Sequence, residues 1–157
     1  MNSWQTLYEN DYPTWAYHNA ELLRAGKFSE VDVTHLIEEL EDMGNSQKDE
    51  LESRLAILLA HLLKWQYQLK QLDDMFGKFE GKSWRASIIE QRNRIQRRLR
   101  KSPGLKSYFS EALVEAYADA VVLASRETGL PLTTFPNECP YSQVQILDDD
   151  YYPPHVI

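Results

Sequence analysis

The chain of 157 residues is poor in cysteine, in glycine and in long apolar runs, and each shortage excludes a class of protein. The single cysteine, Cys139, excludes an internal disulfide and a zinc–thiolate cluster, which fits a reducing cytoplasm. The six glycines form neither a phosphate-binding loop nor a Gly-x-Gly-x-x-Gly pattern. No apolar run is long enough to span a bilayer, and the N-terminus lacks the features of a secretory signal. We therefore expect a soluble cytoplasmic protein that does not enter a membrane.

Charge is unevenly distributed along a chain whose net charge is −7. Residues 82–106 contain nine basic residues and one acidic residue, so they carry +8 and the remainder of the chain carries −15. Nine of the acidic residues fall within 30–52. This separation of charge is the most informative global feature of the sequence.

Hydrophobic periodicity predicts helices along most of the chain, with glycines and prolines between the periodic segments. No strand pattern and no internal repeat is present. We expect helices over residues 13–26, 29–43, 46–71, 83–101 and 105–128, a loop over 73–82 and a short helix over 141–147.

Leucines at helical spacing predict the centre of the core, and alanines predict where another helix can approach closely. The leucine stripe consists of Leu51, Leu55, Leu58, Leu59, Leu62 and Leu63. A second stripe consists of Val33, Leu36, Ile37, Leu40 and Met43, and Gly44 is the expected end of its helix. The small residues are Ala116, Ala120 and Ala124.

The last part of the chain has a different character, because five prolines divide it after Gly129. The tail, residues 151–154, is expected to be an extended strap held to the helices by its tyrosines. We predict an all-α fold, a bundle of about five main helices closed by a proline-rich, irregular C-terminal strap. It is expected to be a single domain over 1–157, with its core at about 11–128 and the strap at 129–157.

Several charged and polar side chains lie beside the apolar stripes and form a predicted polar cluster. A guanidinium buried without a partner is costly, so an acid is expected to meet any inward-facing arginine. One interpretation is a structural layer that fixes helix register, and the other is a pocket for an anion or for acid–base chemistry. The cluster consists of Glu38, Glu41, His61, Lys64, Arg85 and Arg92.

Metal and nucleophile motifs are weak. His35 and Glu38 share a helix face, but their order reverses the Glu-x-x-His pattern of helical carboxylate sites. Cys139 has no histidine near it in the sequence, and no Gly-x-Ser-x-Gly pattern occurs. We expect no metal and no cofactor.

The basic segment predicts an exposed surface that could contact phosphates. An acidic overall composition and the lack of aromatics among the arginines argue against nucleic acid, and the same surface could meet an acidic helix or a second subunit. The surface consists of Arg94, Arg97, Arg98, Arg100 and Lys101.

Six stretches together resemble the bacterial family of proteins known as domain of unknown function 29. The resemblance covers nearly the whole chain and implies an α-helical fold, and it implies no reaction because the family has no assigned activity. The segment 69–82 departs from the family by being longer than the usual link before the Ser-Trp-Arg motif. The matching stretches are residues 7–12, 36–44, 61–67, 83–85 with 91–92, 127–131 and 135–140.

These observations leave function open between classes. We expect a non-enzymatic interaction or regulatory protein whose partner is itself, as a homo-oligomer, or another protein. An enzyme or anion-binding domain built on the predicted polar cluster is the first alternative, and nucleic-acid binding through residues 94–101 is the second.

Overall fold

A computed structural model describes residues 3–70, 72 and 81–156, and in these residues all regular structure is helical. The predicted all-α fold class is therefore confirmed. Contacts divide the chain into two compact units, residues 1–46 and residues 47–157, so the single domain expected from the sequence stays a prediction. No helix in the described part combines the length and apolar character needed to cross a bilayer.

The first unit contains α1 (Ser3–Asn10), α2 (Tyr12–Arg24), a short 3₁₀ turn (Phe28–Glu30) and the beginning of α3. Asp11 caps α2 by accepting a hydrogen bond from the Thr14 amide, and Pro13 occupies its first turn. Gly26 follows α2 with φ of 74°, as the sequence predicted for the end of this helix. The helix α1 was not predicted, because the first predicted helix begins at residue 13.

The third helix, α3 (Val33–Tyr67), corrects two predicted boundaries. Residues 29–43 and 46–71 were predicted as separate helices, but one helix of 35 residues passes through Gly44 without interruption. The predicted start at residue 29 is also wrong, because α3 begins at Val33 and Asp32 Oδ1 accepts from the His35 amide directly before it. A glycine inside a helix costs roughly 1 kcal/mol relative to alanine, which the flanking helix formers outweigh.

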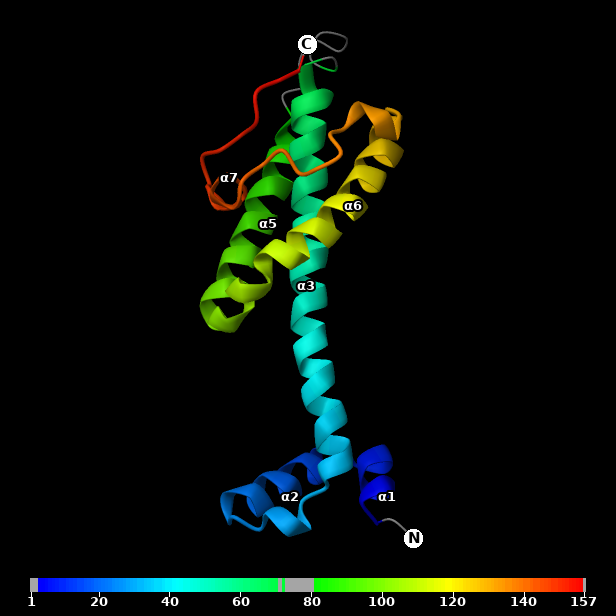
Figure 1. Ribbon diagram of the computed structural model, residues 1–157, viewed down its shortest axis with the longest axis vertical. Coiled ribbons are helices and arrows are strands. Elements are labelled where there is room, and N and C mark those ends of the chain that lie inside the picture. Colours follow the sequence, from blue (N-terminus) through cyan, green and yellow to red (C-terminus); the bar gives the residue numbers. More distant parts are fainter. Residues whose placement is uncertain (1–2, 71, 73–80, 157) are drawn as a thin grey trace. The chain divides into compact units, whose positions relative to one another are not determined.

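The core of the second unit lies where α5 (Lys82–Lys101) and α6 (Phe109–Thr128) run beside the later part of α3 (Figure 1). The predicted leucine stripe of residues 51–63 is buried there. Ala116, Ala120 and Ala124 are buried on α6, as predicted for a close helix contact. A 3₁₀ segment (Pro103–Tyr108) links α5 to α6, and Gly129 ends α6 with φ of 76°.

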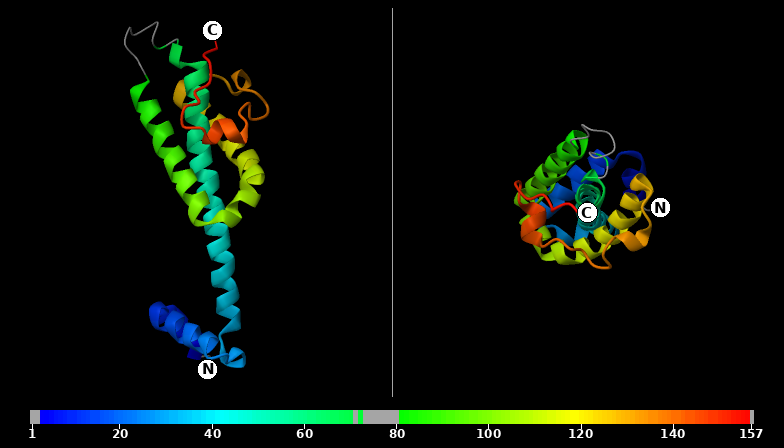
Figure 2. Two further views of the ribbon diagram at one scale, coloured as in Figure 1. Left: turned by 90° about the vertical axis from the view of Figure 1, so that its left-hand side faces the viewer. Right: turned by 90° about the horizontal axis from the view of Figure 1, so that it is seen from above.

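The C-terminal strap crosses the helices and contains a 3₁₀ turn (Leu132–Thr134) and the short α7 (Gln143–Leu147), as Figure 2 also shows. Tyr141 donates a hydrogen bond to the Gln66 side chain at 2.7 Å, and the Val156 amide donates to the Gln66 carbonyl, also at 2.7 Å. Tyr152 packs against Trp65 with ring centroids 4.8 Å apart. These contacts confirm the predicted strap and its aromatic attachment. The predicted loop over 73–82 and the long 69–82 link lie mostly outside the described residues.

Candidate functional site

Arg92, from the predicted polar cluster, is buried on α5 and holds the strap. It is 1% exposed, and its Nε and Nη2 donate to the carbonyls of Ile146 and Gln145 at 2.9 and 3.2 Å. Burial lowers the pKa of the guanidinium, while Tyr152 and the neighbouring aspartates act in the opposite direction. Among the described residues its hydrogen bonds go to carbonyls, while Asp148 and Asp149 act on its charge without a direct hydrogen bond. The carbonyls at the end of a short helix offer the negative potential that an acid was expected to supply.

Lys64 and His61 lie one turn apart on α3 but have different partners. Lys64 is buried, its Nζ is 2.6 Å from Glu127 Oε2, and it lies over the ring of Trp84. His61 Nδ1 contacts the carbonyl of Ile57 at 2.8 Å within the same helix. Burial lowers the pKa of His61, which favours the neutral ring. The acid beside Lys64 is therefore Glu127, which the sequence analysis did not select.

Arg85, the remaining basic member of the cluster, packs against two aromatic rings that also contact each other. Its guanidinium carbon is 4.9 Å from the ring centre of Trp65 and 4.6 Å from that of Tyr152. An arginine stacked on two rings links α5, α3 and the strap by cation–π attraction. The other two members, Glu38 and Glu41, are exposed side chains of the first unit.

The predicted basic surface lies along the C-terminal half of α5. Arg94 pairs with Glu90 at 2.8 Å, and Arg98 pairs with Glu50 at 2.6 Å. Arg97, Arg100 and Lys101 are exposed. Two of the five predicted phosphate contacts are thus occupied by the protein's own carboxylates.

A buried polar network, which the sequence analysis did not identify, organises the first unit around Asp32. Its Oδ2 accepts from Trp15 Nε1 at 2.8 Å and lies 2.7 Å from His35 Nδ1. The Asp32 amide donates to the Asn19 side chain at 2.8 Å, and Tyr8 stacks on His35. The spacing of Asp32 before a helix was a usable signal for a cap, but its contact with Trp15 depends on the tertiary fold.

Low pH is expected to loosen the first unit by protonating this carboxylate. Burial alone raises the pKa of Asp32, but hydrogen bonds from Trp15 and His35 outweigh it and bring the pKa below its ordinary value of 3.8. A carboxyl with a lowered pKa stabilises the fold fully above its unfolded-state value, and this stability is lost as the pH falls through the folded value. We expect the α2 amides to lose protection from hydrogen exchange, corrected for intrinsic rates, as the pH falls below about 4.

The Asp32→Asn variant is the matched test of this pH dependence. It should retain an acceptor for Trp15, and its α2 amides should lose less protection from hydrogen exchange as the pH falls. Part of the loss should remain, because hydrogen bonds from Tyr12 and Tyr8 also lower the pKa of Glu39 in the same unit. Identical pH profiles for the two proteins would show that Asp32 is not responsible.

One face of α3 within the first unit is apolar and exposed. Val33, Ile37, Leu40 and Met43 are 56%, 49%, 63% and 59% exposed, and they form the α3 apolar face. The sequence predicted that these residues share one side of a helix, and they do. The unit's own contacts instead use the side of the helix that carries His35.

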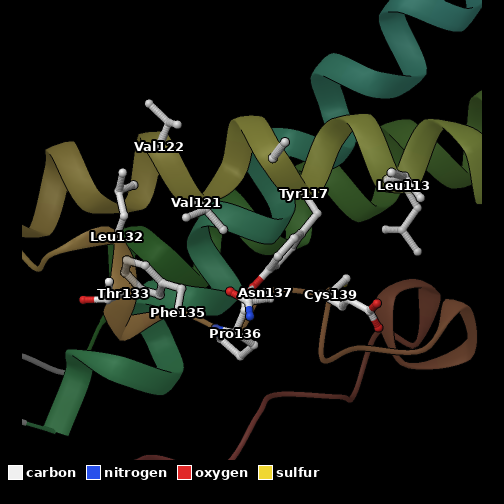
Figure 3. Close-up of a pocket in the computed structure, with 13 residues that line it drawn as sticks. Leu113, Tyr117, Val121, Val122, Leu132, Thr133, Phe135, Pro136, Asn137 and Cys139 are labelled. Atoms are coloured by element: carbon white, nitrogen blue, oxygen red, sulfur yellow. Dashed lines mark hydrogen bonds between the residues drawn. The ribbon is translucent and has the colours of Figure 1, made fainter.

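A groove lies between α6 and the strap of the second unit, and its volume is about 810 Å³ (Figure 3). Residues 113–122 of α6 form one wall, and residues 132–139 of the strap form the other. Most of the lining is apolar, including Leu113, Val121 and Phe135. We call this the α6 groove. The sequence analysis missed it because its walls come from segments that only the fold brings together.

Metal ligands and nucleophiles do not gather at these features. Within residues 3–70, 72 and 81–156, no group of three acidic, histidine or cysteine side chains could hold a metal ion. Cys139 is half-buried in the α6 groove, and burial raises the pKa of its thiol, which disfavours the reactive thiolate.

Comparison with known proteins finds one family model that matches, described as domain of unknown function DUF29, over residues 7–152. No curated protein and no solved structure matches this chain.

Proposed function

The chain belongs to the DUF29 family, and we propose that in this protein the family's helical fold serves a non-enzymatic interaction in which the α3 apolar face binds a basic helix of a partner protein. The observation that carries this proposal is the exposure of Leu40 and Met43, at 63% and 59%, on one continuous helical face. Contiguous exposed apolar side chains mark interaction surfaces more often than isolated ones do.

Charge beside the α3 apolar face defines the partner. Glu41 and Glu38 follow on the adjoining side of the helix, at about 100° per residue, and both are exposed. An amphipathic helix that presents apolar residues at i, i+3, i+4 and i+7 and lysines or arginines beside them complements this surface in shape and charge. A second acidic helix of the same kind would be repelled.

The contacts of the three basic residues of the predicted polar cluster support interaction over catalysis. Arg92 is held by carbonyls, Lys64 by a carboxylate and Arg85 by aromatic rings, so these contacts attach helices and strap to one another. An acid–base site needs a titratable group that faces an open cavity. None of these three residues lines the α6 groove.

A synthetic peptide with leucines at i, i+3, i+4 and i+7 and lysines elsewhere should bind the full-length chain, as measured by fluorescence anisotropy. Replacing both Leu40 and Met43 by lysine should weaken binding by about 30-fold, because two central apolar contacts are each worth about 1 kcal/mol or more. In addition, the two lysines would place charge where apolar surface must be buried.

The matched control adds the same two charges away from the apolar face. Ala25→Lys with Ser46→Lys changes exposed residues of the first unit that belong neither to the apolar face nor to the side of α3 that carries Glu38 and Glu41, and should weaken binding only slightly. A peptide with glutamates in place of lysines should not bind. Equal weakening by the two double variants, or equal binding of both peptides, would contradict the proposal.

A further inference from the structure

We propose that the α6 groove binds a small amphiphile that has an apolar body and a cationic end, such as an alkyl ammonium compound. This site lies in the second unit and does not depend on the interaction proposed for the α3 apolar face. The size, the lining and the charge of the groove suit such a ligand.

The groove has the size of a small-molecule site and is held open by the fold. Its volume of about 810 Å³ lies within the range of roughly 300–1,000 Å³ typical of such pockets. Tyr117 of α6 donates a hydrogen bond to the Pro136 carbonyl of the strap at 2.6 Å, which fixes one wall against the other. A preformed cavity avoids the ordering cost that a flexible site would add to binding.

The walls expose apolar side chains that a ligand would cover. Val114 on α6 is 70% exposed and Leu132 on the strap is 53% exposed, and both line the groove together with Val122. Figure 3 shows Val121 and Phe135 reaching into the space between the two walls. Removing this surface from water favours an apolar ligand body by about 25 cal/mol for each Å² buried.

The charge of the lining selects the ligand's polar end. Glu138 contributes a carboxylate, and none of the lining residues is a lysine, an arginine or a histidine. The other two ionisable groups are neutral at pH 7, because burial raises the pKa of Tyr117 to about 12 and also raises that of Cys139. Asn137 and Thr133 add neutral hydrogen-bonding groups. An ammonium end is therefore attracted, and a carboxylate end of equal length is repelled.

The test compares decylamine, decanol and decanoate as competitors of the fluorescent dye Nile red on the full-length chain. The two ionic compounds are kept below their micelle concentrations, and decanol is kept below its solubility limit. Decylamine should compete about fivefold better than decanol at low salt, because an exposed ion pair is worth at most about 1 kcal/mol. Decanoate should be the weakest competitor. In Glu138→Gln the three compounds should become nearly equal.

Two further variants locate the binding. Ala118 is exposed and lines the groove, so Ala118→Trp should fill it and abolish competition, whereas Ala86→Trp places the same side chain on exposed α5 and should leave it unchanged. Because Cys139 is the single cysteine of the chain and lines the groove, decylamine should slow its labelling by a maleimide at least severalfold.

Three results would overturn the proposal. They are the absence of competition by all three compounds, competition that survives in Ala118→Trp, and an altered oligomeric state in Ala118→Trp. The last result would mean that a second copy of the chain covers the groove. Unchanged melting of both tryptophan variants establishes that they fold. Failure here leaves the peptide experiment on the α3 apolar face unaffected, because that experiment concerns another unit.

Discussion

Replacing Arg92 by methionine is expected to lower the free energy of unfolding by about 3 kcal/mol and to release α7 from α5. The guanidinium donates to the Ile146 and Gln145 carbonyls, and Gln96, one turn further along α5, donates to the Leu147 carbonyl at 2.9 Å. These three carbonyls are at the end of α7, where the helix itself supplies no donors. Methionine fills much of the same volume but donates nothing, so the buried Ile146 carbonyl loses its side-chain partner and the Gln145 carbonyl keeps only the Asp148 amide, at 3.4 Å.

Chemical denaturation monitored by circular dichroism measures the loss of stability, and hydrogen exchange of residues 143–147 reports the release of α7. Arg97→Met is the matched control, because Arg97 is an exposed residue of the same helix and should change stability by less than about 0.5 kcal/mol. If Arg92→Met has the stability and the exchange pattern of the control, the hydrogen bonds to α7 contribute nothing and the structural interpretation of Arg92 fails.

Helix ends that depend on local chemistry could be predicted from the sequence. Gly129 ends α6 in a left-handed conformation that residues other than glycine rarely adopt, and Ser142 caps α7 with a capping box completed by Gln145. The leucine stripe of α3 likewise specified which side faces the core, because apolar residues at helical spacing have one favourable orientation. These signals act within a few residues, so no tertiary contact is needed to interpret them.

Gly44 shows where such signals become ambiguous. A glycine ends α6 at Gly129, whereas Gly44 lies inside α3. Gly129 has a positive φ and Gly44 does not, and the sequence does not indicate which conformation a glycine adopts. The stripe from Val33 to Met43 is ambiguous in a second way. Periodicity identifies an apolar face but not what covers it, and here the first unit leaves that face exposed.

The candidate sites were less predictable than the helices because their partners are distant in sequence. Arg92 meets carbonyls more than 50 residues away, and a backbone carbonyl has no signature in the sequence. The α6 groove joins a helix to a strap that the sequence described only as irregular. Arg92 and Lys64 could be selected from the sequence as buried charged residues. Their partners, two carbonyls and Glu127, could be identified only from the fold.

Replacing Asp32 by alanine is expected to destabilise the first unit by about 3 kcal/mol while leaving the second unit intact. The substitution removes the acceptor for Trp15 Nε1 and for His35 Nδ1, and it removes the side chain that caps α3. Two buried donors then lack a partner, and unsatisfied donors cost more than their hydrogen bonds contributed. Hydrogen exchange of the full-length chain should show α2 amides exchanging about 100-fold faster, which corresponds to that loss of stability.

The same measurement separates a local effect from a general one. Amides of α5 and α6 should keep their protection, since the Asp32 network lies entirely within the first unit. Asp42→Ala removes an exposed carboxylate from the same helix and should leave both units unchanged. Uniformly faster exchange across both units would mean that they unfold together. Unchanged exchange of the α2 amides would mean that packing of Trp15 and Tyr8, rather than the carboxylate, stabilises the first unit. Because the α3 apolar face belongs to that unit, Asp32→Ala should also weaken the binding of the basic peptide without changing any residue on the face itself.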